Sequence, residues 1–151
     1  MKLSLFVLFL VASIQISAFA QKYYTPKSGS AERKEIMDAL RPEFEKYFGV
    51  QLKFVVDEFK VLFTSTGSFV WITFEPSNPK TNKLYDISET ILRDKSEEFD
   101  SGLKTYAILK KVNKTWKVVN YVCSPTDVPW VCWWKEYSFP KEIFTNTAPD
   151  C

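Results

Sequence analysis

The sequence predicts an α+β fold in which an N-terminal helix packs on a curved antiparallel sheet of four or more strands. Three observations predict this fold: an apolar stripe at helical spacing near the N-terminus, a strand whose apolar phase changes halfway, and two successive hairpin patterns. The composition agrees with a globular domain, because 46% of the 151 residues are hydrophobic, 17% aromatic and 25% charged.

The N-terminus has the pattern of a secretory signal. Lys2 precedes an apolar stretch (residues 3–11), and Ala18 and Ala20 are small residues at the positions that a signal peptidase reads. The stretch is too short for a membrane-spanning helix of about 20 residues, so we expect a cleaved signal and a secreted or periplasmic product without a membrane span. We therefore divide the chain into a signal peptide (1–20), a flexible lead-in (21–29) and a single domain (30–151).

The first helix of the domain is expected to begin after Ser30, a suitable N-cap, and to end at Gly49. Pro42 lies inside this range and predicts a kink in the helix, or a split after Leu40, because proline has no backbone N–H to donate. The apolar stripe consists of Ile36, Leu40, Phe44, Tyr47 and Phe48.

The first hairpin follows directly. Residues 50–56 alternate between apolar and polar side chains, and the phase changes after Asp57 and Glu58, which predicts a β-bulge or bend there. Residues 64–68 are rich in turn-forming types, and residues 69–74 form the returning strand. A bend of this kind allows a sheet to curl around a helix.

A second hairpin is predicted from strands at 106–111 and 116–123, which are joined by the turn 112–115. Between the two hairpins lies an insertion, residues 76–101. Within this insertion Asp86 could cap a short helix that has Glu89 at its third position. Insertions of this length are functional lids or mobile loops, and we interpret this one as a mobile loop.

Large aromatic side chains gather near the C-terminus, where Asp127 could cap a short helix. Trp130, Trp133, Trp134 and Tyr137 follow at helical spacing. Such a stripe either closes the open end of the sheet as core or forms a contact surface for a ligand or a protein. We take these four residues, together with Asp127, as the candidate binding surface.

The three cysteines, Cys123, Cys132 and Cys151, are expected in an oxidising compartment. Cys123 and Cys132 flank a turn-rich stretch and are the preferred disulfide pair. Cys151 could instead pair with either of them, and one thiol remains in every case.

Several classes of function are excluded or disfavoured. The chain has no histidine, which excludes Ser-His-Asp and Cys-His catalysis, and its 20 Lys and Arg nearly balance its 18 Asp and Glu, which disfavours nucleic-acid binding. There is no glycine-rich phosphate loop and no CxxC spacing, so we expect no cofactor, no metal site and no catalytic residue. The carboxylates that could act as general acids or bases are Asp57, Glu58, Glu75 and Asp127, and the candidates for an isomerase-like or hydratase-like pocket are Asp57, Glu58 and Asp127.

The chain also resembles a group of small secreted bacterial proteins of unassigned activity. The resemblance covers most of residues 31–144 apart from the insertion, and it implies a cystatin-like or nuclear-transport-factor-two-like fold. Pro129 and Trp130 are similar to the second inhibitory loop of cystatins, but the Gln-x-Val-x-Gly loop of those inhibitors is missing. The segments that carry the resemblance are 32–42, 50–56, 106–109, 116–119 and 126–130.

These observations lead to two hypotheses of function. The first is a secreted, non-enzymatic binding domain for an unknown protein partner. The alternative is a small-molecule pocket, with or without isomerase-like activity, in the space between helix and sheet. The alternative requires a buried carboxylate close to a tyrosine hydroxyl. The sequence leaves the oligomeric state open.

Overall fold

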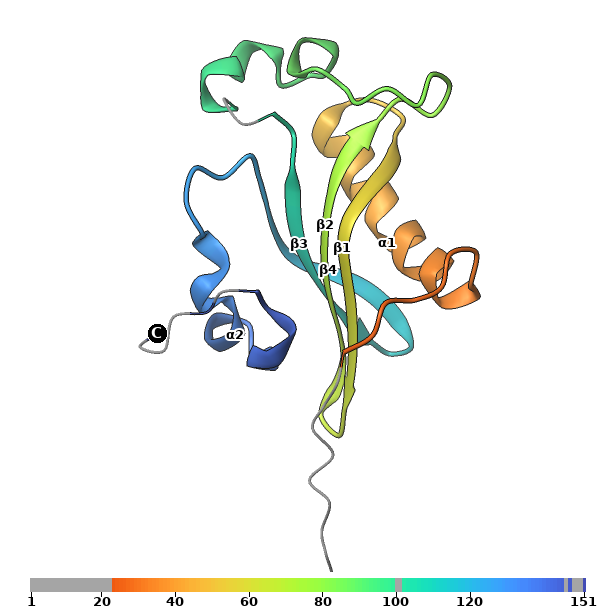
Figure 1. The fold of residues 1–151 in the computed structure, drawn as a ribbon, viewed down its shortest axis with the longest axis vertical. Helices are drawn as coiled ribbons and strands as arrows, with labels where there is room; N and C mark the ends of the chain where they lie inside the picture. The colour runs from red at the N-terminus through yellow and green to blue at the C-terminus, as the bar shows by residue number, and fades with distance from the viewer. Residues whose placement is uncertain (1–22, 100–101, 146, 148–150) are drawn as a thin grey trace, which may run out of the picture.

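The computed structural model describes residues 23–99, 102–145, 147 and 151. One long helix precedes four strands, which form a single open antiparallel sheet in the order β1-β2-β3-β4 (Figure 1). This arrangement confirms the predicted α+β class. The main elements are α1 (Ala31–Phe48), β1 (Lys53–Thr64), β2 (Gly67–Ser77), β3 (Thr105–Val112), β4 (Thr115–Cys123) and the short α2 (Trp133–Glu136).

Helix α1 begins and ends where its capping residues predict. The Ser30 hydroxyl accepts a hydrogen bond from the backbone N–H of Arg33, and Gly49 adopts the left-handed conformation (φ 71°) that commonly ends a helix. The helix is not split at Pro42, contrary to one of the outcomes predicted there. Leu40 and Phe44, on either side of the proline, are both fully buried against the sheet, which holds the helix together across the lost hydrogen bond.

The strands carry the predicted irregularity and a second one. The β1–β2 register shifts between Val56 and Glu58, which confirms the predicted bulge. The β3–β4 register also shifts, opposite Ile108 and Leu109. The β3–β4 turn is formed by Asn113 and Lys114, both at positive φ, as in the tight turns that suit the twist of a hairpin.

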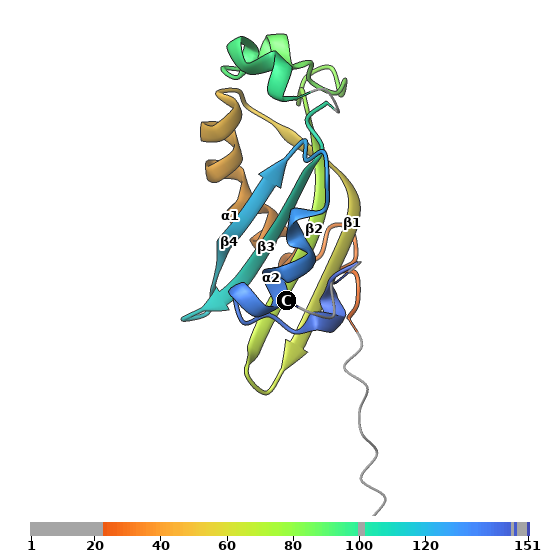
Figure 2. The same ribbon diagram turned by 90° about the vertical axis from the view of Figure 1, so that its left-hand side faces the viewer.

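The sheet is covered on both faces. Helix α1 packs on one face, and the C-terminal segment (residues 124–145) packs on the other (Figures 1 and 2). The second layer was not part of the predicted fold. The buried side chains between the sheet and the C-terminal segment are Leu62, Phe69, Trp71 and Ile108 of the strands and Trp130, Trp133, Phe139, Ile143 and Phe144 of the segment.

The insertion between β2 and β3 is folded onto the end of the α1 core. It contains two 3₁₀ helices, η1 (Ile87–Glu89) and η2 (Arg93–Glu98), and the predicted capping box of Asp86 and Glu89 is present. Its Phe99 side chain is buried in the α1 core. The contact is close at Gly49, where an added Cβ would lie 2.2 Å from Ile91 Cγ2, so this position requires glycine.

The preferred disulfide pair is wrong. Cys132 bonds to Cys151, with their Cα atoms 5.4 Å apart, and Cys123 is a free thiol. Cys123 packs against the α1 core, whereas Cys132 lies in the segment that covers the opposite face, so the sheet separates them. Burial raises the pKa of the Cys123 thiol to about 11, which keeps it protonated at neutral pH.

Candidate functional site

Two of the four predicted aromatic contact residues lie inside the protein. Trp130 stacks on Tyr106 with ring centroids 4.1 Å apart, and its ring lies 5.7 Å from that of Trp71. Trp133 is 4% exposed and also packs against Trp71. Trp130 and Trp133 therefore form the core of the second face, which was the other interpretation of the helical stripe.

The other two aromatic residues are only partly buried. Trp134 lies beside the β1–β2 turn, where the ammonium of Lys141 is 4.8 Å from its ring centroid. Tyr137 packs edge-on against Trp133. A shallow groove of about 440 Å³ runs past Trp134 between residues 64–66 and 138–142.

Asp127 does not cap a helix as predicted. The following 3₁₀ helix, η3 (Pro129–Cys132), begins after Val128, which makes no side-chain capping bond. Asp127 is exposed in the preceding loop. The structure therefore does not join Asp127 to a single contact surface with the buried tryptophans.

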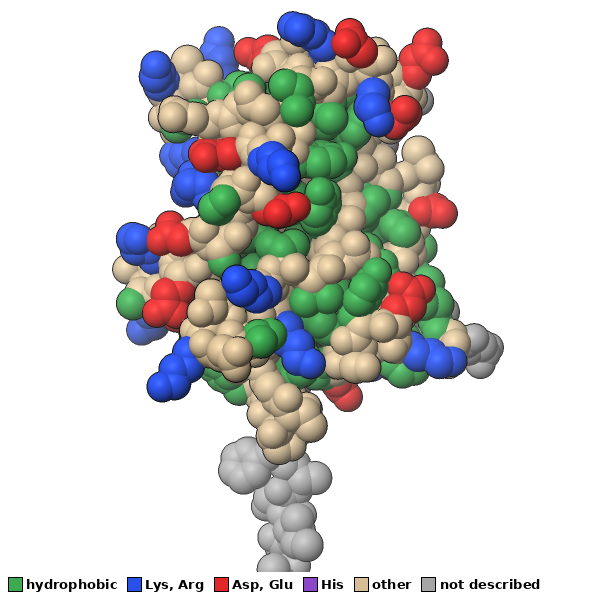
Figure 3. Space-filling view, turned by 180° about the vertical axis from the view of Figure 1, so that it is seen from behind, with side chains coloured by type: hydrophobic (Ala, Val, Ile, Leu, Met, Phe, Trp, Pro, Cys, Tyr) green, Lys and Arg blue, Asp and Glu red, His purple; other side chains and the backbone are tan. Residues whose placement is uncertain are grey.

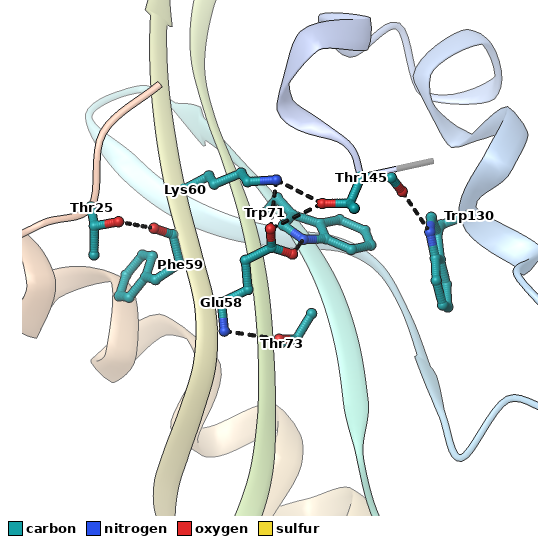
Figure 4. Close-up of polar contacts among 8 residues, drawn as sticks. All are labelled: Thr25, Glu58, Phe59, Lys60, Trp71, Thr73, Trp130 and Thr145. Carbon is teal, nitrogen blue, oxygen red and sulfur yellow. Dashed lines mark hydrogen bonds and ion pairs between the residues drawn. The ribbon is translucent and has the colours of Figure 1, made fainter. Parts of the chain in front are cut away.

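The most buried charge of the second face belongs to Lys60, whose side chain is 10% exposed (Figure 4). Its ammonium lies 2.6 Å from Glu58 Oε1 and donates to Thr145 Oγ1 at 2.7 Å. Thr145 donates in turn to Glu58, and the Trp71 indole N–H donates to the other carboxylate oxygen. The backbone oxygen of Thr145 accepts a bond from Trp130.

This network has a structural role, because it fixes the end of the C-terminal segment to the sheet. Burial alone would raise the pKa of Glu58, but the hydrogen bonds from Lys60, Trp71 and Thr145 and the nearby ammonium outweigh it and lower the pKa. The lowered pKa keeps the Glu58 carboxylate ionised at neutral pH, where it accepts hydrogen bonds from its neighbours. The network ties the end of the C-terminal segment to β1.

Two of the carboxylates proposed for an isomerase-like pocket, Asp57 and Glu58, line a surface groove of about 260 Å³ with Tyr23, but neither accepts a hydrogen bond from a tyrosine hydroxyl of the described residues. Asp57 is exposed and pairs with Lys104 at 2.7 Å, Glu58 belongs to the Lys60 network, and Asp127 lies in a distant loop. The space between α1 and the sheet is filled with side chains rather than hollow. Those side chains include Ile36, Leu40, Phe44, Phe48, Phe74, Leu109 and Trp116.

A groove of about 590 Å³ lies between α1 and the start of β4. One wall is the acidic side of α1, and the other holds Lys114 and Lys117. The remaining lining residues are Glu35, Asp38, Ala39, Pro42, Glu43, Thr115, Trp116 and Val118.

Part of the charge along this groove is unpaired. Glu35 pairs with Lys111, and Asp38 pairs with Lys34. Glu43, Lys114 and Lys117, by contrast, have neither a hydrogen bond nor an ion pair to any residue that the structure describes. The groove therefore has a free carboxylate on its helix side, and lysines without an ion pair border it on the strand side.

Trp116 forms the apolar floor of the groove. Its ring is 3% exposed, and the ammonium of Lys111 lies 5.2 Å from the ring centroid. Its indole N–H is buried and has no acceptor within the described part of the chain. Buried donors without acceptors are rare because they cost about 1–3 kcal/mol each. The sequence predicts Trp116 as a strand residue and not as a site residue, because the groove is formed by segments that are far apart along the chain.

Comparisons of the chain with known protein families, with curated proteins and with solved structures found no match. The helix on a four-stranded antiparallel sheet is shown by the structure alone, and the more specific cystatin-like or nuclear-transport-factor-two-like assignment stays a prediction. Within the described residues, no helix is long and apolar enough to cross a membrane, and no cluster of three or more Asp, Glu or Cys side chains could hold a metal ion.

Proposed function

We propose that this chain is a secreted, non-enzymatic binding domain that holds a protein partner in the groove between α1 and β4. The proposal rests on polar groups of this groove that have no partner. Charged side chains of both signs border the groove without forming ion pairs, and the indole N–H of Trp116 at its floor is buried without an acceptor. The N-terminal signal pattern and the Cys132–Cys151 disulfide support secretion.

A protein partner suits this groove better than a small molecule. Small-molecule sites bury most of the ligand in a concave, largely apolar pocket, whereas this groove is open and bordered by long charged side chains. Opposite charges on its two walls would orient a polypeptide that carries complementary charges.

The test is selection of a phage-displayed library of random dodecapeptides on the mature chain (residues 21–151), followed by affinity measurement with synthetic copies of the selected peptides. We expect Lys114→Glu with Lys117→Glu to weaken their binding by about tenfold or more, because each lost charge contact costs on the order of 1 kcal/mol. Glu43→Lys should also weaken the binding of peptides that carry a basic residue.

The matched control is Lys80→Glu with Lys83→Glu, which makes the same charge change at two exposed lysines of the insertion. This control should leave the affinity unchanged. If the groove variants leave the affinity of the peptides unchanged and Trp134→Ala abolishes their binding, the proposed groove is wrong and the contact surface lies on the C-terminal segment.

A further inference from the structure

The two edges of the sheet differ in what covers them. At the β1 edge, Tyr24 exchanges two backbone hydrogen bonds with Val61, at 2.9 and 2.8 Å, and the Thr25 hydroxyl donates to the carbonyl of Phe59. At the β4 edge no described segment pairs with the strand. Figure 2 shows the two edges on opposite sides of the sheet, with the C-terminal segment in front.

The register of the second hairpin shows which backbone groups are free at the β4 edge. Val112 and Thr115 close a two-residue turn and so form a hydrogen-bonded pair. Positions alternate along an antiparallel ladder, so Trp116 and Val118 occupy the positions that do not bond to β3. Their N–H and C=O groups therefore point away from the sheet, beside the groove.

The chain itself limits what can pair there. The register shift at Val119 interrupts the regular edge, which leaves a short stretch, residues 115–118, for pairing. Lys114 and Lys117 stand along this stretch, and lysines on an edge oppose pairing with an identical copy because like charges would meet. Both features favour a partner of different sequence over a second copy.

We infer that the groove binds an extended segment of its partner as a fifth strand beside β4. This inference rests on the proposed function and specifies the occupant. The segment would bond through its backbone to Trp116 and Val118 and would turn alternate side chains toward the apolar floor. Its charged side chains would be acidic toward Lys114 and Lys117 and basic toward Glu43.

The surface around this edge fits such an occupant. Figure 3 views the molecule from behind, on the side where β4 lies, and hydrophobic side chains run through the middle of this face with acidic and basic side chains beside them. Val118 is partly buried on the α1 side, and Ala39 and Pro42 of the helix complete the apolar lining. An added strand would extend the apolar face of the sheet.

The deciding experiment scans a selected peptide with backbone N-methyl groups and measures its affinity for the mature chain by fluorescence polarisation. N-methylation removes one backbone donor and leaves the side chain in place. We expect a period of two: N-methyl groups at alternate residues should weaken binding by tenfold or more, whereas those between should change it little. Uniform tolerance of N-methylation would overturn strand addition.

A protein variant provides the complementary test. Val118→Pro removes an outward N–H that no strand of the described residues uses, and proline is tolerated at such edge positions. It should keep the circular dichroism spectrum of the native chain and lose peptide binding. As the control, Val118→Ala also removes side-chain bulk at this position but keeps the backbone N–H, and it should retain peptide binding.

The two proposals fail in distinguishable ways. Peptides that depend on Lys114 and Lys117 but tolerate every N-methyl group would retain the groove and refute the added strand. Peptides that ignore the groove lysines would refute the proposed function itself. A dimer of the native chain that Val118→Pro dissociates, with no peptide bound, would make a second copy the occupant and overturn the inference.

Discussion

On one face of the sheet a regular helix covers an apolar core, whereas on the other an irregular segment is held by several different kinds of contact. Phe44 of α1 meets Phe48, Phe74 and Tyr121 in a continuous aromatic cluster. The C-terminal segment adds to its aromatic packing a disulfide and the hydrogen bonds of Thr145 with the partly buried ion pair of Lys60 and Glu58 on β1.

The two layers are stabilised by different kinds of interaction. A helix satisfies its own backbone hydrogen bonds, so apolar contact with the sheet is enough to fix it. The C-terminal segment has only one turn of α-helix and short 3₁₀ turns, and it needs specific tethers because it gains less from internal hydrogen bonds. We therefore expect the two faces to respond differently to substitution, reduction and acid.

The largest effect is expected from Phe44→Ala. It leaves a cavity in the α1 core and should lower the free energy of unfolding by about 3–5 kcal/mol. Chemical denaturation followed by far-ultraviolet circular dichroism measures this loss. Leu84→Ala, at a residue that is 49% exposed, is the control and should change stability little. A small effect of Phe44→Ala would show that the helix is not the main cover of this face.

Cutting the Cys132–Cys151 disulfide should have the next largest effect. Closing a loop of this length contributes about 3 kcal/mol, so Cys132→Ser with Cys151→Ser should destabilise the second face by a similar amount. Trp71, Trp130, Trp133 and Trp134 lie on that face, so tryptophan emission should shift to the red before helical signal is lost.

Cys123→Ser is the matched control for this prediction, because Cys123 is a free thiol on the other face. It should leave the tryptophan emission unchanged. Mass spectrometry after alkylation of the native chain should find Cys123 as the reduced cysteine. A disulfide that includes Cys123 would contradict the pairing.

A smaller effect is expected from Lys60→Met. The substitution leaves Glu58 partly buried without its ammonium partner, and it should cost about 2 kcal/mol, less than for a fully buried pair because the carboxylate is partly exposed. Lys104→Met breaks the more exposed pair with Asp57 and serves as the control, with an expected cost below about 1 kcal/mol. Equal costs for the two variants would show that the Lys60 network is not an anchor.

The smallest effect is a dependence on acid. The pKa of Glu58 is lower in the folded chain than in the unfolded chain, so its contribution to stability is present above the ordinary glutamate value of about 4.3 and is lost as pH falls through the folded value. Unfolding of the native chain should become easier below about pH 4.3. Glu58→Gln should flatten this part of the pH profile, and an unchanged profile would contradict the role of Glu58.

Much of the first face could be predicted from the sequence because its signals are local. The spacing of Ile36, Leu40 and Phe44 is a property of one helix, and the phase change after Asp57 is a property of one strand. The structures that these patterns predict, an amphipathic helix and a bulge, depend only on residues that are a few positions apart along the chain.

One feature of the sequence does indicate a second layer. The strand residues Phe69 to Phe74 are nearly all apolar rather than alternating, which is typical of a strand buried on both faces. Residues 124–145 supply the cover that this run requires. The continuous apolar run thus indicates burial, although it does not say which segment provides it.

The sequence by itself determined the helix, its caps, the hairpins and the bulge of β1, since each depends on side chains that are close along the chain. Only the tertiary structure decided that Cys132 pairs with Cys151, that Trp130 and Trp133 are buried, and that Trp116 faces α1 across a charged groove. Those outcomes depend on which distant segments share a face of the sheet. Local periodicity carries no information about that choice, because it is made when the layers pack together.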